Sequence, residues 1–90
     1  MRNPWRNLGT TSRRWLAEAG IVEPGQLAEL GAVRAWLRVK ARQPAVSLNL
    51  LWAMQGALCD LSWQQVAREQ RLSLLLALED AQKNGAPDAD

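Results

Sequence analysis

The stretch SLNLLWAMQGALCDL, residues 47–61, decides the fold of this chain. Its apolar side chains point in nearly every direction around a helix, and a helix that is apolar on all sides is typically the central one of a globular domain. We expect the helix to start after Ser47, a favourable N-cap residue, to run to about residue 60 and to bury Trp52. Asn49 is also predicted to be buried, with its amide hydrogen-bonded to a neighbouring turn, because a buried amide needs partners.

The residues before this helix are predicted to form an arm over residues 1–5 and then a first short helix. Thr10 or Thr11 is expected to cap that helix through its hydroxyl group, because Gly9 breaks the backbone just before it. Gly20 is the expected stop, since glycine adopts without steric cost the left-handed backbone that ends many helices.

Two more short helices are expected before the central one. Pro24 suits the first turn of the second helix, which ends at Gly31, and the third helix then covers about residues 32–41. Pro44 lies in the loop that stops this third helix. The N-terminal half of the chain therefore consists of short helices joined by glycine and proline turns.

The C-terminal part begins with Ser62, which together with Gln65 forms a capping box, the sequence signature of a helix start. Apolar residues keep helical spacing from there to about residue 83, and a break near Arg68 is an alternative to one continuous helix. Residues 84–90 are predicted to be a disordered tail. No segment alternates polar and apolar residues with a period of two, so no sheet is expected.

Together these elements predict an all-α fold, a compact bundle of about five short helices that forms one domain over residues 6–83. The chain has five Trp and neither Phe nor Tyr, so tryptophan is expected to fill the large positions of the core. For Trp5 two outcomes stay open, since it could pack back on the domain or serve a partner. The other four occupy core-facing helical positions and are Trp15, Trp36, Trp52 and Trp63.

The composition excludes several classes of site. The chain has no His and only one Cys, which rules out a four-ligand Cys/His zinc site and removes the commonest general base. Cys59 is expected to be a small buried residue, and a lone cysteine suits a reducing cytoplasm. No apolar run is long enough to span a membrane. We therefore expect a non-catalytic cytoplasmic protein with no cofactor, no metal, no small-molecule substrate and no membrane contact.

Charge is divided unevenly along the chain, whose net charge is +2. Residues 1–42 hold eight Lys or Arg and three Glu, a net charge of +5, whereas residues 43–90 hold three Lys or Arg and six Asp or Glu, a net charge of −3. A basic half can attract an anionic partner. The alternative is that the two halves are simply two solvated surfaces of different charge.

The turn before the first helix is one candidate site for a nucleic-acid phosphate. A helix start offers unpaired backbone N–H groups and a partial positive charge, which together attract anions. The alternative is that the glycine only makes a turn and a threonine only caps the helix. The candidate residues are Gly9, Thr10, Thr11, Arg13 and Arg14.

A second candidate site is formed by Arg34, Arg38 and Arg42, which recur every four residues and so follow one face of the third helix. Such a stripe could track a nucleic-acid backbone, with an affinity that falls as salt rises. The alternative is a solvated face that pairs with Glu29 or with acidic residues of the other half.

Several stretches, taken in order, resemble a known family. They are RNLG (residues 6–9), WLAEAGI (15–21), QLAELGAV (26–33) and VSLNLLWAM (46–54), followed by GAL (56–58). In this order they resemble the C-terminal domain of the TfoX/Sxy family over about residues 6–79. The resemblance implies a compact helical fold related to helix-hairpin-helix domains, and a link to the regulation of natural competence and transcription in bacteria. Full-length members carry a further N-terminal domain. A sequence of 90 residues leaves no room for it, so we expect a stand-alone C-terminal domain here.

The resemblance also bears on how DNA would be held. Helix-hairpin-helix domains that grip DNA often carry a Pro-Lys-like pair after the turn glycine. Thr10 and Thr11 occupy those places in this chain, which leaves Arg13 and Arg14 as substitutes for the phosphate-binding lysine.

Two functions are therefore predicted. The first is a non-catalytic regulatory module that takes part in DNA-associated transcriptional regulation, with DNA as its partner. The alternative is a protein–protein interaction module with no direct nucleic-acid binding, whose partner is another transcription regulator or a second copy of the chain.

Overall fold

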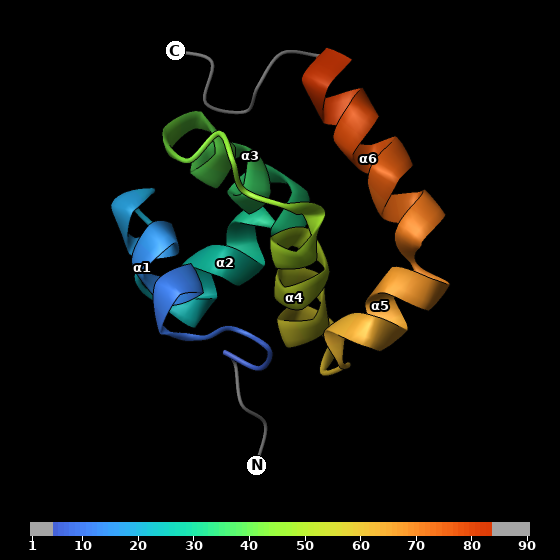
Figure 1. Cartoon of the computed structure of the whole chain (residues 1–90), viewed down its shortest axis with the longest axis horizontal. Helices are drawn as coiled ribbons and strands as arrows, with labels where there is room; N and C mark the ends of the chain where they lie inside the picture. Colours follow the sequence, from blue (N-terminus) through green and yellow to red (C-terminus); the bar gives the residue numbers. More distant parts are fainter. Residues whose placement is uncertain (1–4, 84–90) are drawn as a thin grey trace.

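A computed structural model describes residues 5–83 of the chain, and every regular element in that range is a helix (Figure 1). The predicted all-α fold is therefore confirmed. Six helices are present in the described range where about five were expected, because the last predicted helix is divided in two. They are α1 (Thr10–Glu18), α2 (Pro24–Leu30), α3 (Ala32–Arg42), α4 (Leu48–Cys59), α5 (Trp63–Glu69) and α6 (Arg71–Lys83).

The central position of α4 follows from its apolar surface. Figure 1 shows α4 in the middle of the molecule, between α1 and α2 on one side and α5 and α6 on the other. It packs directly on α3 and α5. Because side chains on all of its sides are removed from water, its burial supplies much of the hydrophobic stabilisation of the fold. Its buried residues are Leu50, Leu51, Trp52, Ala53, Met54, Gly56 and Ala57.

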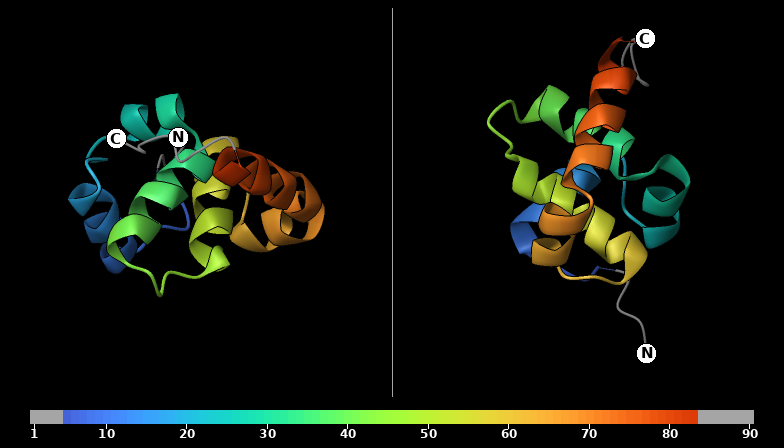
Figure 2. Two further views of the ribbon diagram at one scale, coloured as in Figure 1. Left: turned by 90° about the horizontal axis from the view of Figure 1, so that it is seen from above. Right: turned by 90° about the vertical axis from the view of Figure 1, so that its right-hand side faces the viewer.

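The division between α5 and α6 falls at Gln70, close to the break near Arg68 that the sequence allowed. The Gln70 N–H donates the last α5 bond to the Val66 carbonyl at 2.8 Å, and α6 starts at the next residue. This bend lets α6 turn back and pack on α3. It then runs along the outside of the molecule, as both views in Figure 2 show.

Several helix boundaries lie where single residues predicted them. The capping box of α5 is formed, with the Gln65 N–H and the Ser62 hydroxyl 3.2 Å apart and a return bond from the Ser62 N–H to the Gln65 side chain. Pro24 is the first residue of α2. Gly20 and Gly31 have φ angles of 88° and 86°, a backbone region that disfavours residues with a side chain. These corners are confirmed.

Three residues predicted to be buried are exposed instead. Asn49 is exposed in the first turn of α4 and its side chain forms no hydrogen bond within residues 5–83, so its predicted structural role is wrong. Cys59 is exposed because it is the last residue of α4, where the helix leaves the core. Trp63 is 40% exposed at the start of α5.

The other tryptophans do belong to the core. Trp36 and Trp52 are buried as predicted, and the Trp36 indole Nε1–H donates a hydrogen bond of 3.0 Å to the Ser47 carbonyl. Trp15 and Trp5 are half-buried and pack against the core. For Trp5 this is the first of the two outcomes that the sequence left open.

The segment before α1 is fastened to the far end of α4 by Asn7. The Asn7 backbone adopts a left-handed conformation with φ 71°, and its side-chain amide donates to the Leu61 carbonyl at 2.9 Å and the Ala53 carbonyl at 3.5 Å. Arg6 adds a second link, with its guanidinium 3.2 Å from the Asp60 carboxylate. We call this set of contacts the Asn7 clamp. It fixes where α1 begins.

The Asn7 clamp depends on the absence of a side chain at Gly56. A Cβ atom there would collide with the Asn7 amide nitrogen and would lie 2.5 Å from the Leu61 carbonyl oxygen. Gly56 therefore allows the close approach of three separate segments, although glycine within a helix is intrinsically unfavourable by about 1 kcal/mol relative to alanine.

We predict opposite effects of alanine at two helical glycines. Gly56→Ala should lower the free energy of unfolding by about 1–3 kcal/mol, because the new methyl group forces the Asn7 clamp apart. Gly25→Ala is the matched control, since no atom lies within 4 Å of its Cβ position, and it should raise stability by about 0.4–1 kcal/mol. Urea denaturation of both variants measures the difference. Equal stability of the two would contradict the close approach at Gly56.

Candidate nucleic-acid interface

The start of α1 carries no side-chain cap. Gly9 is the N-cap residue, with extended backbone at φ −84° and ψ −175°, and its carbonyl accepts the Arg13 N–H at 3.0 Å. Thr10 is already the first helical residue, so the prediction that Thr10 or Thr11 caps the helix is wrong. The reason is positional, since a capping side chain must belong to the residue before the helix, and here that residue is glycine. The first N–H groups of α1 are left to solvent or a ligand.

The charges around this helix start favour an anion. Arg13 and Arg14 are exposed, and the first turn of α1 contains no acidic residue. Neither arginine forms an ion pair with any residue between 5 and 83. The partial positive charge at the helix start therefore adds to two guanidinium groups that are not neutralised within the described fold.

Trp5 brings an aromatic ring to the same place. It lines a shallow pocket of about 290 Å³ together with Thr10 and Arg13, and the turn after α1 closes the other side through Ile21 and Val22. The pocket thus combines an indole, a hydroxyl and a guanidinium beside the uncapped helix start. The sequence missed this arrangement because Trp5 was placed in an arm.

The three arginines of α3 do not form one uniform stripe. Arg34 and Arg42 are exposed, whereas Arg38 is half-buried and lines a pocket with Gly20 and Glu29. Arg38 and Arg42 also line a smaller hollow beside Ala19, just past the end of α1. Arg38 and Arg42 therefore lie near the C-terminal end of α1, while the Gly9 to Arg14 segment forms its beginning. The structure does not bring the two predicted sets into one pocket.

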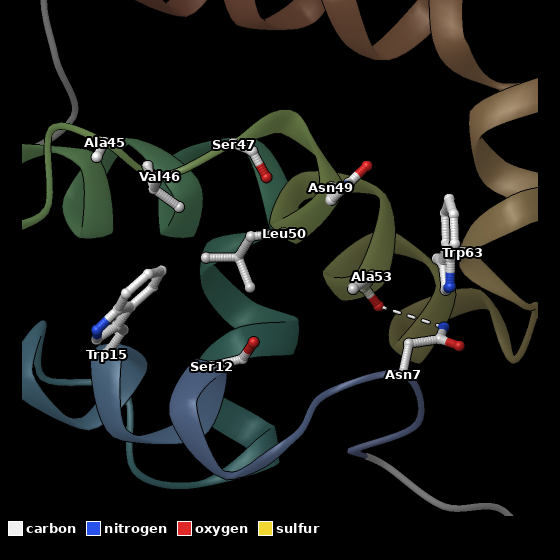
Figure 3. A pocket seen from close by; sticks show the side chains of 10 residues that line it. All are labelled: Asn7, Ser12, Trp15, Ala45, Val46, Ser47, Asn49, Leu50, Ala53 and Trp63. Carbon is white, nitrogen blue, oxygen red and sulfur yellow. Dashed lines mark hydrogen bonds between the residues drawn. The ribbon is translucent and has the colours of Figure 1, made fainter.

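A different groove, without charged residues, lies between α1 and α4. It has a volume of about 410 Å³. In Figure 3 the indoles of Trp15 and Trp63 stand on opposite sides of it, and Leu50 and Ala53 lie between them. Asn49 and Ser47 add uncharged polar groups. The sequence missed this groove because Trp63 was expected in the core. The signal that could have found it is the position of Trp63 directly after the Ser62 cap, which makes it the first residue of a helix that starts at the surface.

Residues 5–83 lack two further features that would point to a function. No group of three His, Cys, Asp or Glu side chains there could hold a metal ion. None of the described helices combines the length and apolar character needed to cross a membrane.

Comparison with known proteins identifies a family. The model of a family described as the TfoX C-terminal domain matches residues 3–78, which is nearly the whole chain. Neither the comparison with curated proteins nor that with solved structures yields a match.

The uncapped start of α1 leads to a prediction about its threonines. Thr11→Ala should change the free energy of unfolding by no more than about 0.5 kcal/mol, because its exposed side chain caps nothing. Ser62→Ala, the matched control at a formed cap, should cost about 1 kcal/mol. Thermal and urea unfolding of the two variants test this. A loss at Thr11 as large as that at Ser62 would mean that the threonine does cap α1.

Proposed function

The chain belongs to the TfoX C-terminal domain family, and we propose that it is a non-catalytic regulatory module that acts in DNA-associated transcriptional regulation. Within this proposal it works in the bacterial cytoplasm and takes part in the control of natural competence. The observation that carries the proposal is the start of α1, where an uncapped helix end meets two exposed arginines that have no acidic neighbour in the first turn.

The first step of the argument concerns phosphate. Backbone N–H groups at a helix start point along the helix axis towards the solvent, and the helix dipole favours negative charge there. A DNA phosphate placed against Gly9 could accept hydrogen bonds from the first turn of α1. Glycine suits this position because it has no side chain, and no atom lies within 4 Å of its Cβ position.

The second step concerns the side chains around that phosphate. Arg13 faces the pocket that Trp5 also lines, so its guanidinium and the indole could hold a neighbouring part of the nucleic acid through a charged contact and a ring contact. Arg14 is exposed on the same helix and can contact a further phosphate. These two arginines take the role that a lysine after the turn glycine has in related DNA-binding domains.

The third step concerns the extent of the surface. Arg34 and Arg42 are exposed on α3 and form no ion pair within the described residues, so they can extend the contact along a nucleic-acid backbone. Arg38 contributes less, because it is half-buried in the pocket that Glu29 lines. With so few phosphate contacts and a net charge of only +2, binding should be modest, and it should fall with salt along a shallow slope, because the slope scales with the number of phosphate contacts.

The alternative is a protein–protein interaction module that does not touch nucleic acid directly. A specific observation favours it, since Leu72 and Leu76 of α6 are 71% and 56% exposed. Apolar side chains that are neighbours on one helix face commonly mark an interaction site. The two functions use different parts of the chain and are tested separately.

We predict that the protein binds duplex DNA at low salt and that Arg13→Ala/Arg14→Ala weakens this binding. Each phosphate contact contributes about 0.9 to the slope of log K against log salt, so the double variant should lower the slope by roughly 2. Fluorescence anisotropy of a labelled duplex, measured over a series of salt concentrations, gives both affinity and slope.

The matched control is Arg68→Ala/Lys83→Ala, which removes the same charge from the acidic half of the chain and should leave the slope unchanged. If the control weakens binding as much as the α1 variant, net charge and not the α1 surface is responsible. If the unmodified protein does not bind DNA at low salt, the proposal of a direct DNA contact is wrong.

A further inference from the structure

We propose that the groove between α1 and α4 holds unstacked bases of single-stranded DNA, so that the domain prefers a single strand to a duplex. This inference rests on the proposed function, because it takes the start of α1 as the phosphate site and adds a place for the base beside it. The groove has a volume of about 410 Å³, a size typical of pockets that take a small organic group. Its lining indicates which group that is.

The two sides of the groove each offer an aromatic ring. The indoles of Trp15 and Trp63 stand on opposite sides of it (Figure 3). Trp15 is half-buried and Trp63 is 40% exposed. Since every base has a flat π face, an accessible indole can stack on any base of a single strand. Within an intact duplex the bases are stacked on one another and cannot be reached in this way. The rings therefore favour a single strand.

The polar groups of the groove suit the edge of a base. Asn49 lines the groove and is exposed, and its side chain forms no hydrogen bond within residues 5–83. A side-chain amide carries donors and an acceptor, and these match the donors and acceptors on the edge of a base. Ser12 and Ser47 line the same groove, and no charged residue does. A lining that forms hydrogen bonds without carrying charge fits a neutral base.

The groove continues to the start of α1. Asn7 and Ser12 both line it, and in the sequence they stand on either side of Gly9. The Arg13 N–H donates to the Gly9 carbonyl, so the Ser12 N–H belongs to the first turn, whose donors have no partner within the helix. A phosphate bound to these N–H groups would lie at the end of the groove. The base of the same nucleotide can then enter the groove.

Electrostatics alone would give the opposite preference. A duplex has a higher charge density than a single strand, and the slope of log K against log salt is about 0.9 for each phosphate contact in a duplex but about 0.7 in a single strand. A surface that contacts only phosphates should therefore favour the duplex. Stacking in the groove adds affinity that only the single strand gains. A preference for the single strand thus separates base contacts from phosphate contacts.

The first test compares three labelled probes by fluorescence anisotropy at one salt concentration. They are a short oligothymidylate, the same strand paired with its complement, and an abasic strand of equal length. The oligothymidylate should bind more tightly than the duplex and about tenfold more tightly than the abasic strand, since stacking on an aromatic ring contributes about that factor. Duplex binding without this preference overturns the inference and leaves the proposed function standing. Binding of none of the probes overturns both.

The second test uses variants of the groove. Trp63→Ala should weaken oligothymidylate binding by about tenfold, Asn49→Ala should also weaken it, and both should leave duplex binding unchanged. Both remove exposed side chains, and circular dichroism checks that the helix content is kept. Leu72→Ala is the matched control and should change neither affinity, because Leu72 is 71% exposed on α6 and does not line the groove. A single-strand preference that survives Trp63→Ala means that the groove does not hold the base.

The indole N–H resonances in an NMR spectrum give a direct readout. Addition of the oligothymidylate should shift the signals of Trp15 and Trp63, whereas the abasic strand should not. The signal of Trp52 is the internal reference, because this residue is buried and does not line the groove. Equal shifts with the two probes would mean that the groove senses the phosphates and not the base, which overturns the inference.

Discussion

The fold depends on one constraint, that α4 must be kept from water on every side. An amphipathic helix needs cover on one face only, whereas the apolar residues of α4 leave it no face that can be left to solvent. The bend at Gln70 follows from the same need for cover. With α5 beside α4 and α6 folded back on α3, the C-terminal part of the chain closes one side of the molecule while α1 and α2 close the other.

The Asn7 clamp connects this core to the surface proposed to bind DNA. Hydrophobic packing is not directional, so it does not by itself determine where α1 begins. Hydrogen bonds are directional, and the Asn7 amide ties the residues before α1 to the Ala53 carbonyl within α4 and to the Leu61 carbonyl just after it. Gly9 and the uncapped turn follow two residues later. Asn7 and Leu61 are 54 residues apart in sequence, and the hydrogen bond between them thus determines where α1 begins. This is the helix start that could receive a phosphate.

Sequence patterns predicted the elements better than the orientation of their side chains. Ser62, Pro24, Gly20 and Gly31 act through their own backbone or through residues three positions away, so their roles could be predicted locally. Asn49 and Cys59 were misplaced because they lie in the first and last turns of α4, and the apolar pattern of the helix does not show how far its burial extends towards either end. Asn7 was missed for another reason, as its partners are distant in sequence. Thr10 was expected to precede α1 as a cap, but it is the first residue of the helix. Sequence patterns place a helix boundary only to within one or two residues, and a shift of one residue decides whether Thr10 can cap.

The proposed DNA surface lies in the basic half of the chain, and its charges are not balanced by the neighbouring helices. Arg13, Arg14, Arg34 and Arg42 form no ion pair within the described residues and attract an anion, whereas α6 holds as many acidic as basic residues and adds no net charge. Because few side chains of this domain can contact phosphate, the backbone N–H groups at the start of α1 matter more to the proposed DNA contact than the net charge of the chain does.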